Sequence, residues 1–235
     1  MSQVIFSIIL PVYNQQDHLE KMITGYLNAL KKSNYIWELI IVVNGSKDLS
    51  FKIAAKMAQL DYRIRAYNLR KAGWGRAVKF GIIKSNGEFI CYTNSAKTQY
   101  KDLIKLLKAA KRNPLAITKA VRRNRRVSFI HKIGSTLYNL EYRILFRLPT
   151  LDVNGTPKII PRFFVKKLIP SSLGDLFDAE LLIKTYRQKL GIHEIPISEG
   201  KRLSGKSTTT LFSACKMYLG LIKLRFLPSF QNTFL

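Results

Sequence analysis

Two short runs of apolar residues, Phe6–Val12 and residues 39–43, constrain the fold of this chain more than any other feature. A strand that is apolar at every position is covered on both faces, as in parallel sheets with helices on either side. Between the two runs, residues 17–32 repeat leucine and isoleucine at helical spacing, which predicts an amphipathic helix. Strand, helix and strand in this order predict an α/β fold with a mostly parallel sheet and right-handed crossovers.

The same alternation continues along the chain. The first half is expected to hold further helices over 50–59, 73–85 and 100–112 and strands over 63–67 and 88–92. The second half is expected to hold a helix over 128–146, a loop over 151–162, a helix over 178–189 and a strand over 192–197. Gly191 is expected to end the last helix as a left-handed cap. Ligands of such sheets bind at the carboxyl ends of the strands, so the loops after residues 12, 43, 67 and 92 are the candidate site.

The charge of the chain is one-sided. Forty Lys and Arg residues against 14 Asp and Glu residues give a net charge of +26. So basic a surface attracts polyanions, which include nucleic acid, anionic lipid headgroups and phosphorylated substrates. A hydrophobic share of 47% excludes disorder as the main state.

The cysteines and histidines indicate neither a disulfide framework nor a zinc site. There are two cysteines, Cys91 and Cys215, and Cys91 lies in an apolar run that predicts a buried thiol. This usage fits the cytoplasm. The amino-terminal run lacks the features of a signal peptide. Lys216, Lys223 and Arg225 make the apolar stretch 211–227 too polar to span a membrane.

Six segments, in order along the chain, carry a resemblance to a known family. They are Ser7–Asn14, Glu38–Asp48, Gly73–Gly81, Leu151–Lys158, Phe177–Leu182 with Gly191–Ile197, and Arg202–Ser207. Together they resemble the family 2 glycosyltransferases, in particular the branch of dolichyl- and polyprenyl-phosphate mannose synthase-like enzymes. The resemblance implies a single Rossmann-like domain of the GT-A type over residues 1–210, with an amphipathic helix or tail over 211–235. It also implies an inverting transfer of sugar from a nucleotide-sugar or related activated donor to a lipid-phosphate or other membrane-associated acceptor.

The resemblance assigns the site residues in three groups. The donor-binding group is Pro11, Tyr13, Asn14, Asn44, Gly75, Arg76, Asn94, Ala96 and Lys97. The catalytic pair is Asp178 and Asp152. The acceptor- or phosphate-binding group is Arg122, Arg126, Lys158, Arg202 and Lys206. We expect Asp152, Lys158, Asp178 and Arg202 to line one cleft, with Lys158 in a loop that reaches a phosphate.

The sequence departs from the family where a nucleotide and a metal are normally held. The D-x-D position reads Asn94-Ser95-Ala96, and Gln15 and Asn44 stand where the family has acids. Magnesium and manganese favour carboxylate oxygens, so we expect no ordinary metal site, with Mg²⁺ or Mn²⁺ binding weakened. Lys97 could then neutralise the leaving diphosphate in place of a metal, or it is a solvated loop lysine.

Several alternatives stay open at this stage. Asp178 is either a group that faces the acceptor or a carboxylate that favours the helix dipole, and Asp152 could pair with a neighbouring arginine. The tail residues Leu211, Cys215, Tyr218, Leu219, Ile222 and Phe226 form a stripe that packs on the core or lies in a membrane interface. A peripheral protein at the cytoplasmic face of an anionic membrane fits the charge.

The competing functions are a catalytically impaired family member and a nucleic-acid-binding protein that uses the Arg122–Arg126 patch. The patch lacks the interleaved aromatic residues of such proteins.

Overall fold

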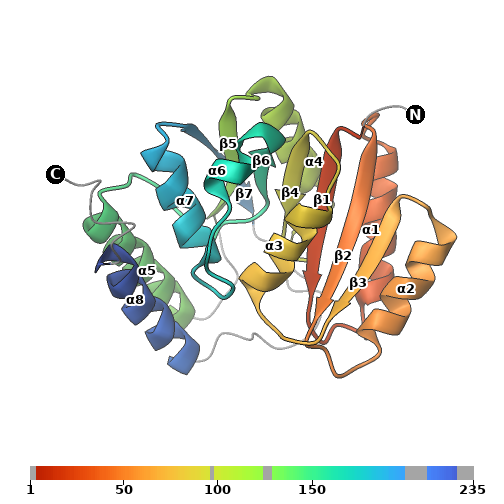
Figure 1. Cartoon of the computed structure of the whole chain (residues 1–235), viewed down its shortest axis with the longest axis horizontal. Helices are drawn as coiled ribbons and strands as arrows, with labels where there is room; N and C mark the ends of the chain where they lie inside the picture. The colour runs from red at the N-terminus through yellow and green to blue at the C-terminus, as the bar shows by residue number, and fades with distance from the viewer. Residues whose placement is uncertain (1–3, 96–97, 124–128, 199–210, 227–235) are drawn as a thin grey trace.

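The computed structural model describes residues 4–95, 98–123, 129–198 and 211–226, and within them a single mixed sheet forms the centre (Figure 1). The strand order is β3-β2-β1-β4-β6-β5-β7. The strands are β1 Phe6–Val12, β2 Trp37–Asn44, β3 Ile64–Leu69, β4 Phe89–Tyr92, β5 Ala116–Arg123, β6 Lys158–Pro161 and β7 Gly191–Ser198. Only β6 is antiparallel to its neighbours among the pairs of this sheet. The expected α/β fold with a mostly parallel sheet is confirmed.

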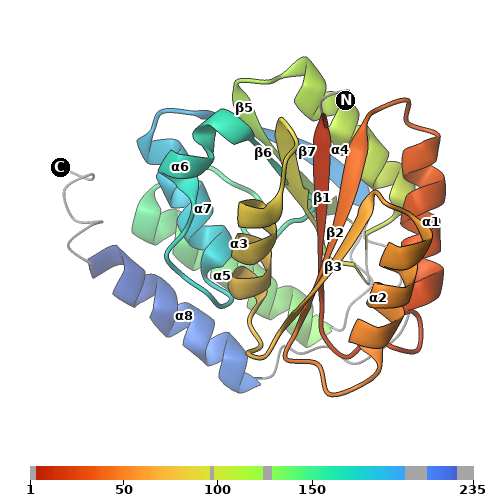
Figure 2. The ribbon, with the colours of Figure 1, turned by 45° about the vertical axis from the view of Figure 1, so that its right-hand side comes forward.

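Helices cover both faces of the sheet, and a further pair lies beyond one of them (Figures 1 and 2). The helical elements are α1 Leu19–Lys31, α2 Ser50–Leu60, α3 Trp74–Lys84, α4 Tyr100–Arg112, α5 Phe129–Phe146, a 3-10 turn Arg162–Phe164, α6 Val165–Leu168, α7 Phe177–Arg187 and α8 Leu211–Phe226. None of the helices within the described ranges is long and apolar enough to cross a membrane.

Alternate side chains of the strands feed two separate cores. Ile8, Leu10 and Cys91 pack with α1, α2 and α4 on one face, which confirms the buried thiol. Ile9 and Tyr92 pack with α3, α6 and α7 on the other face. Every residue of β1 and β2 is buried, as their continuous apolar runs predict.

A third apolar cluster joins α5 and α8 to the outer side of α7. Tyr142 and Phe146 of α5 meet Leu182 of α7 and Leu221 and Leu224 of α8. The two helices therefore form an additional layer on the α7 side of the molecule, where Figure 1 shows them side by side.

Three sequence-based expectations in the second half were wrong. Residues 116–123 form strand β5, where only a basic cluster was expected. The expected loop over 151–162 ends in strand β6, which begins at Lys158 and continues into the 3-10 turn. Gly191 opens β7, and the residue with left-handed backbone after α7 is Lys189, with φ of 53°.

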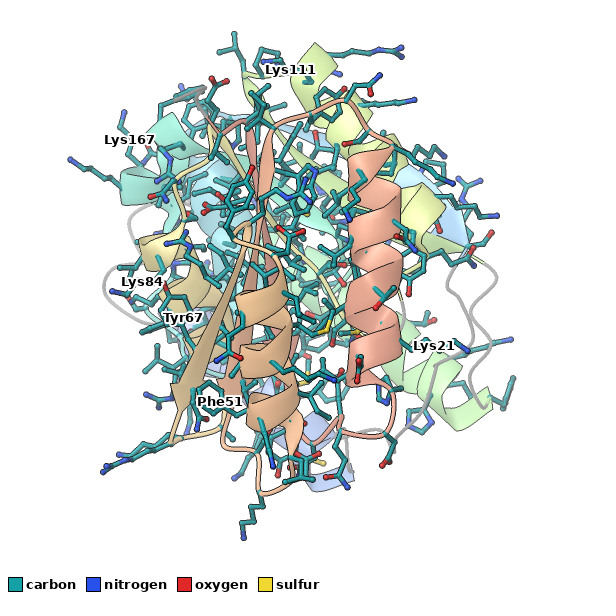
Figure 3. The ribbon with its side chains drawn as sticks, turned by 90° about the vertical axis from the view of Figure 1, so that its right-hand side faces the viewer. Lys21, Phe51, Tyr67, Lys84, Lys111 and Lys167 are labelled. Atoms are coloured by element: carbon teal, nitrogen blue, oxygen red, sulfur yellow. The ribbon has the colours of Figure 1, made fainter. Side chains whose placement is uncertain are left out.

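The surplus of basic residues is spread over the surface. Figure 3 shows Lys21, Lys84, Lys111 and Lys167 extending outward from four different helices, α1, α3, α4 and α6. All four residues are exposed. The positive charge is therefore not confined to one binding site, and it acts on any polyanion that approaches.

Candidate functional site

The loops at the carboxyl ends of β1 and β2 are joined through Asn14. Its backbone adopts a left-handed conformation, with φ of 48°, which asparagine tolerates better than most residues. The Asn14 backbone N–H donates to Ser46 Oγ at 3.0 Å, and the Lys47 N–H donates to Asn14 Oδ1 at 2.9 Å. Tyr13, next to it, is exposed at the same edge of the sheet. Both residues therefore lie at the carboxyl ends of the strands, where we expected the donor to bind.

Asn44 lies at this edge as well, but its side chain is used inside the protein. The amide nitrogen donates to the Val12 carbonyl at 2.8 Å, and the amide oxygen accepts from the Gly73 N–H at 3.0 Å. The residue is only 4% exposed. The expectation that Asn44 contacts the donor directly is therefore not supported by its geometry, and the residue instead ties the β1 end to the turn that opens α3.

Gly75 and Arg76, at the start of α3, face α7 and the segment before it. A Cβ atom on Gly75 would lie 2.8 Å from Phe177 Cβ and 2.9 Å from the Leu173 carbonyl carbon. The Arg76 N–H donates to the Leu173 carbonyl at 2.8 Å. Gly75 is thus needed for the close approach of α3 to this segment, rather than for the approach of a donor.

The loop after β4 holds neutral groups where the family has carboxylates. Ser95 is buried, and its hydroxyl lies 3.1 Å from the Pro11 carbonyl and 2.9 Å from Gln15 Oε1. Asn94 beside it is half-buried. Within the described part of the chain no three His, Cys, Asp or Glu side chains come together to hold a metal ion. Mg²⁺ and Mn²⁺ sites in proteins are usually built on carboxylates, and Asn94 and Ser95 supply none. Ala96 and Lys97 lie outside the described residues.

Asp178, in the first turn of α7, is held by three donors from three elements. Its Oδ1 accepts from Tyr92 OH at 2.7 Å and from Lys158 Nζ at 2.5 Å, and its Oδ2 accepts from Trp74 Nε1 at 2.9 Å. Burial raises the pKa of Tyr92, and the Asp178 charge adds to this. Burial lowers the pKa of Lys158 to about 8, although Asp178 opposes the shift. A carboxylate that accepts hydrogen bonds from three elements fixes the positions of its donors relative to one another.

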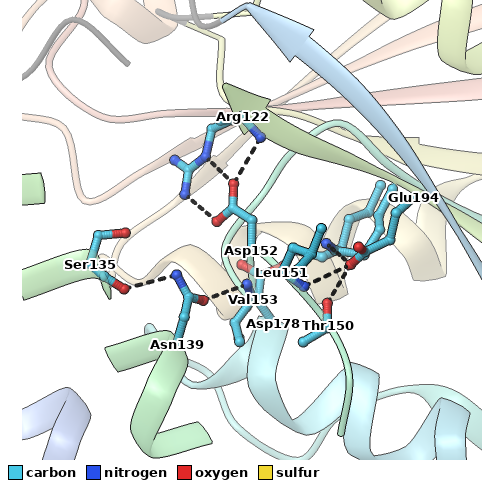
Figure 4. Close-up of polar contacts among 11 residues, drawn as sticks. Arg122, Ser135, Asn139, Thr150, Leu151, Asp152, Val153, Asp178 and Glu194 are labelled. Atoms are coloured by element: carbon cyan, nitrogen blue, oxygen red, sulfur yellow. Dashed lines mark hydrogen bonds and ion pairs between the residues drawn. The ribbon is translucent and has the colours of Figure 1, made fainter. Parts of the chain in front are cut away.

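The register of the sheet aligns these groups with a second ion pair. Tyr92 of β4 lies opposite Lys158 of β6, Lys158 opposite Lys119 of β5, and Lys119 opposite Glu194 of β7. Lys119 Nζ donates to Glu194 Oε1 at 2.9 Å, and neither lysine side chain is exposed. The same oxygen accepts from Thr150 Oγ1 at 2.6 Å (Figure 4). The four side chains form one polar row across four strands.

Asp152 pairs with Arg122, as the alternative interpretation held. Arg122 Nε and Nη2 each donate to this carboxylate at 2.8 Å, and the Arg122 N–H donates at 3.1 Å (Figure 4). Burial alone would raise the pKa of Asp152, but Arg122 outweighs it and holds that pKa well below its usual range. Burial lowers the pKa of Lys158, and the charges of Asp178 and Asp152 both oppose this shift.

The arrangement corrects the expected role of Lys158. It is a fully buried residue of a strand, paired with Asp178, rather than a loop lysine that reaches a phosphate. Asp152, Lys158 and Asp178 are all buried, and their place in one cleft with Arg202 stays a prediction. Arg126, Arg202 and Lys206 lie outside the described residues.

Four residues of these polar contacts were not predicted from the sequence: Trp74, Tyr92, Lys119 and Glu194. The signal for Lys119 was its place in the otherwise uncharged segment Ala116–Val121, since a lysine on the buried side of a strand requires a partner.

Comparisons with known proteins agree on one family. A model described as "Glycosyl transferase family 2" matches residues 7–169. The dolichyl-phosphate beta-glucosyltransferase of Saccharomyces cerevisiae is 24% identical over 95% of this chain and 75% of its own length. The undecaprenyl-phosphate 4-deoxy-4-formamido-L-arabinose transferase of Salmonella choleraesuis is 28% identical over 57% of this chain and 42% of its own length.

Solved structures agree on the fold. Glucosyl-3-phosphoglycerate synthase of Mycobacterium tuberculosis, determined with Mn²⁺, UDP-glucose and phosphoglyceric acid, superposes with a TM-score of 0.74 at 16% identity. The match covers 94% of this chain and 79% of that one. At this identity the likeness confirms the GT-A fold alone.

Proposed function

The chain belongs to glycosyl transferase family 2, and we propose that it transfers a sugar from a nucleotide-sugar donor to a lipid-phosphate acceptor. The observation that carries the proposal is the family match over residues 7–169, extended by a relative that covers 95% of the chain and is named for transfer to dolichyl phosphate. Residues 1–210 would form the catalytic domain.

The donor would bind at the carboxyl ends of β1, β2 and β4. Tyr13 is the exposed aromatic residue at this edge and can stack on a nucleotide base, while Asn14 fixes the loop that carries it. Pro11 contributes the carbonyl that holds Ser95, so its role would be to shape the loop after β4. We assign Asn44, Gly75 and Arg76 to positioning, because their contacts are internal.

The acceptor would bind between the carboxyl end of β5, at Arg122, and the first turn of α7, at Asp178. A lipid phosphate is ionised at neutral pH, so its attack on the sugar does not require a general base. This fits an Asp178 whose carboxylate already accepts three hydrogen bonds, from Tyr92, Trp74 and Lys158. Arg122, already oriented by Asp152, would present the basic end of β5 to the phosphate. Asp178 would keep Tyr92 and Lys158 in place beneath the reacting groups.

The reaction would proceed at an anionic membrane surface and without a tightly bound metal. The charge of +26 draws the protein to anionic lipids, and its placement at the cytoplasmic face of a membrane is part of the proposal. The residues near Asn94 and Ser95 do not fit a divalent cation, so we derive no step through one.

A transfer assay tests the proposal. The full chain is incubated with labelled UDP- or GDP-sugars and polyprenyl phosphate in detergent, and the labelled lipid product is quantified. Tyr13→Ala is expected to raise the donor KM about tenfold, since stacking on a base contributes about 1–3 kcal/mol. Tyr62→Ala is the matched control, because Tyr62 is exposed on the loop before β3, at the opposite edge of the sheet.

The outcomes separate the candidate functions. Labelled lipid from the parent supports the proposal, and transfer only to a water-soluble phosphorylated acceptor refutes it. Donor binding without any transfer indicates the impaired family member, which the loss of acids at Asn94 and Gln15 favours.

A further inference from the structure

Helix α5 is apolar on the face that points away from the protein as well as on the buried one. Five exposed apolar side chains follow one another at spacings of three or four residues: Phe129, Ile133, Leu137, Leu140 and Ile144. This spacing puts them on one stripe. The opposite side of the helix carries the buried residues Tyr138, Tyr142 and Phe146. The stripe is therefore not needed for the core.

Helix α8 repeats this arrangement beside α5. Leu221 and Leu224 are buried against the third cluster, while Leu219, Ile222 and Phe226 are exposed on the other side. Of the stripe named from the sequence, Leu219, Ile222 and Phe226 thus face outward, whereas Tyr218 packs against the third cluster. Tyr218 OH donates to the Gly134 carbonyl at 2.6 Å, which fixes the two helices together. We call the eight exposed residues the outer α5–α8 face.

The charges around the outer α5–α8 face have one sign. Lys132 and Arg143 of α5 and Lys216 and Lys223 of α8 are exposed. By sequence, Glu141 is the one acidic residue in the two helices, and it is half-buried. Large apolar patches bordered by polar residues mark interaction surfaces. A second copy of the chain would bring like charges together, whereas an anionic bilayer complements both the apolar stripe and its basic border.

We propose that the outer α5–α8 face docks on an anionic lipid bilayer, with its apolar side chains at the level of the headgroups and the upper acyl chains. The consequence for acceptor access, though not the docking itself, rests on the proposed function. Figures 1 and 2 show the amino-terminal ends of both helices nearest the edge at which β1 and β2 end. The Val153 N–H donates to Asn139 Oδ1 of α5 at 2.9 Å, next to Asp152 (Figure 4). Docking would hold the acceptor side of the site against the headgroups, where a lipid phosphate lies.

Flotation with vesicles tests the docking. The parent and a Leu137→Ser, Leu140→Ser, Ile144→Ser variant are mixed with phosphatidylcholine vesicles that do or do not contain phosphatidylserine. All three side chains are exposed, so the melting temperature should not change. The parent is expected to float with the anionic vesicles, and the variant is expected to partition at least tenfold more weakly.

A matched control removes the same number of exposed apolar side chains elsewhere. Leu60→Ser, Tyr62→Ser and Leu115→Ser lie at 70, 91 and 72% exposure, outside α5 and α8. This variant should float as the parent does. The proposal is overturned if both variants float equally well. It is also overturned if sedimentation velocity shows a parent dimer that only the α5 variant dissociates, since the face would then bind a second copy.

The transfer assay separates this inference from the proposed function. The α5 variant should keep its rate on a short-chain polyprenyl phosphate in solution and lose at least tenfold on an acceptor embedded in vesicles. A parent that floats but transfers no sugar refutes the proposed function and leaves the docking supported. Equal rates of parent and α5 variant on the embedded acceptor would refute the consequence for acceptor access.

Discussion

At the scale of single residues, Asn44 shows why a missing acid does not mean a missing function. An amide both donates and accepts, and Asn44 does both, to the Val12 carbonyl and from the Gly73 N–H. A carboxylate at this position could accept from Gly73 but could not donate to Val12. The neutral residues on the donor side therefore serve the loops themselves. The sequence could indicate that the acids were gone, but not that this replacement had a structural use.

The Asp152–Arg122 pair gives a prediction whose sign follows from its pKa. Because Arg122 holds the pKa of Asp152 below its unfolded value, the pair stabilises the fold above about pH 4. This stability is lost as the pH falls further, toward the folded-state pKa. Asp152→Asn removes the buried carboxylate to which Arg122 donates, so we expect a loss of about 3 kcal/mol at pH 7.

Urea unfolding at pH 7 and at pH 3 measures this difference. The gap between parent and Asp152→Asn should shrink at pH 3, because Asp152 of the unfolded parent binds a proton there while the folded parent keeps the charge. Asp17→Asn, at an exposed position, should cost less than about 0.5 kcal/mol at both values. A gap of equal size at both pH values would show that the hydrogen-bond geometry, rather than the charge, stabilises the pair.

At the scale of elements, the predicted and the missed strands differ in where their stabilising contacts come from. β1 and β2 were predictable because their central residues are apolar and every residue is buried. β5 contains Lys119, whose partner Glu194 is 75 residues away along the chain. β6 is four residues long and begins with Lys158, which is paired through α7. Local pattern cannot show a partner that only the tertiary structure supplies, so these strands and the polar row between them were missed.

The approach of α3 to α7 gives a prediction about packing. Gly75→Ala would put a Cβ atom 2.8 Å from Phe177 Cβ and 2.9 Å from the Leu173 carbonyl carbon. Either α3 must move away from α7 or the backbone at Leu173 must shift. Overpacking of this kind costs about 1–3 kcal/mol. Since Trp74 and Asp178 sit at this contact, the transfer rate should fall as well.

Gly174→Ala is the control for this change, because a Cβ atom there meets nothing within 4 Å. Urea unfolding should place the control within about 0.5 kcal/mol of the parent. If Gly75→Ala were as stable and as active as Gly174→Ala, the glycine would not be required for the approach of α3, and a role toward the donor would regain support.

At the scale of the whole molecule, the site is assembled from segments far apart in the sequence. Trp74, Tyr92, Lys158 and Asp178 come from α3, β4, β6 and α7. The order of the six motifs was enough to predict the family. It could not predict that Asp178 and Lys158 neutralise each other, since that depends on the antiparallel insertion of β6 between β4 and β5. The unexpected outer α5–α8 face likewise follows from how α8 packs.

Whether donor binding needs a divalent metal ion depends on the charge of the whole chain. The loop after β4 offers Asn94 and a bonded Ser95 in place of carboxylates, while the net charge of +26 attracts a diphosphate without a metal. We therefore expect the Kd for UDP, measured by calorimetry, to differ by less than about threefold between Mn²⁺ and a chelator. In the double variant Asn94→Asp, Ala96→Asp the family's acids are restored, and Mn²⁺ should tighten binding at least tenfold, about 1.4 kcal/mol. The variant serves as the positive control, because it shows that the assay detects a metal when carboxylates are present. Tenfold tightening by Mn²⁺ in the parent itself would mean that other oxygen ligands complete a metal site, and the metal-independent proposal would fail.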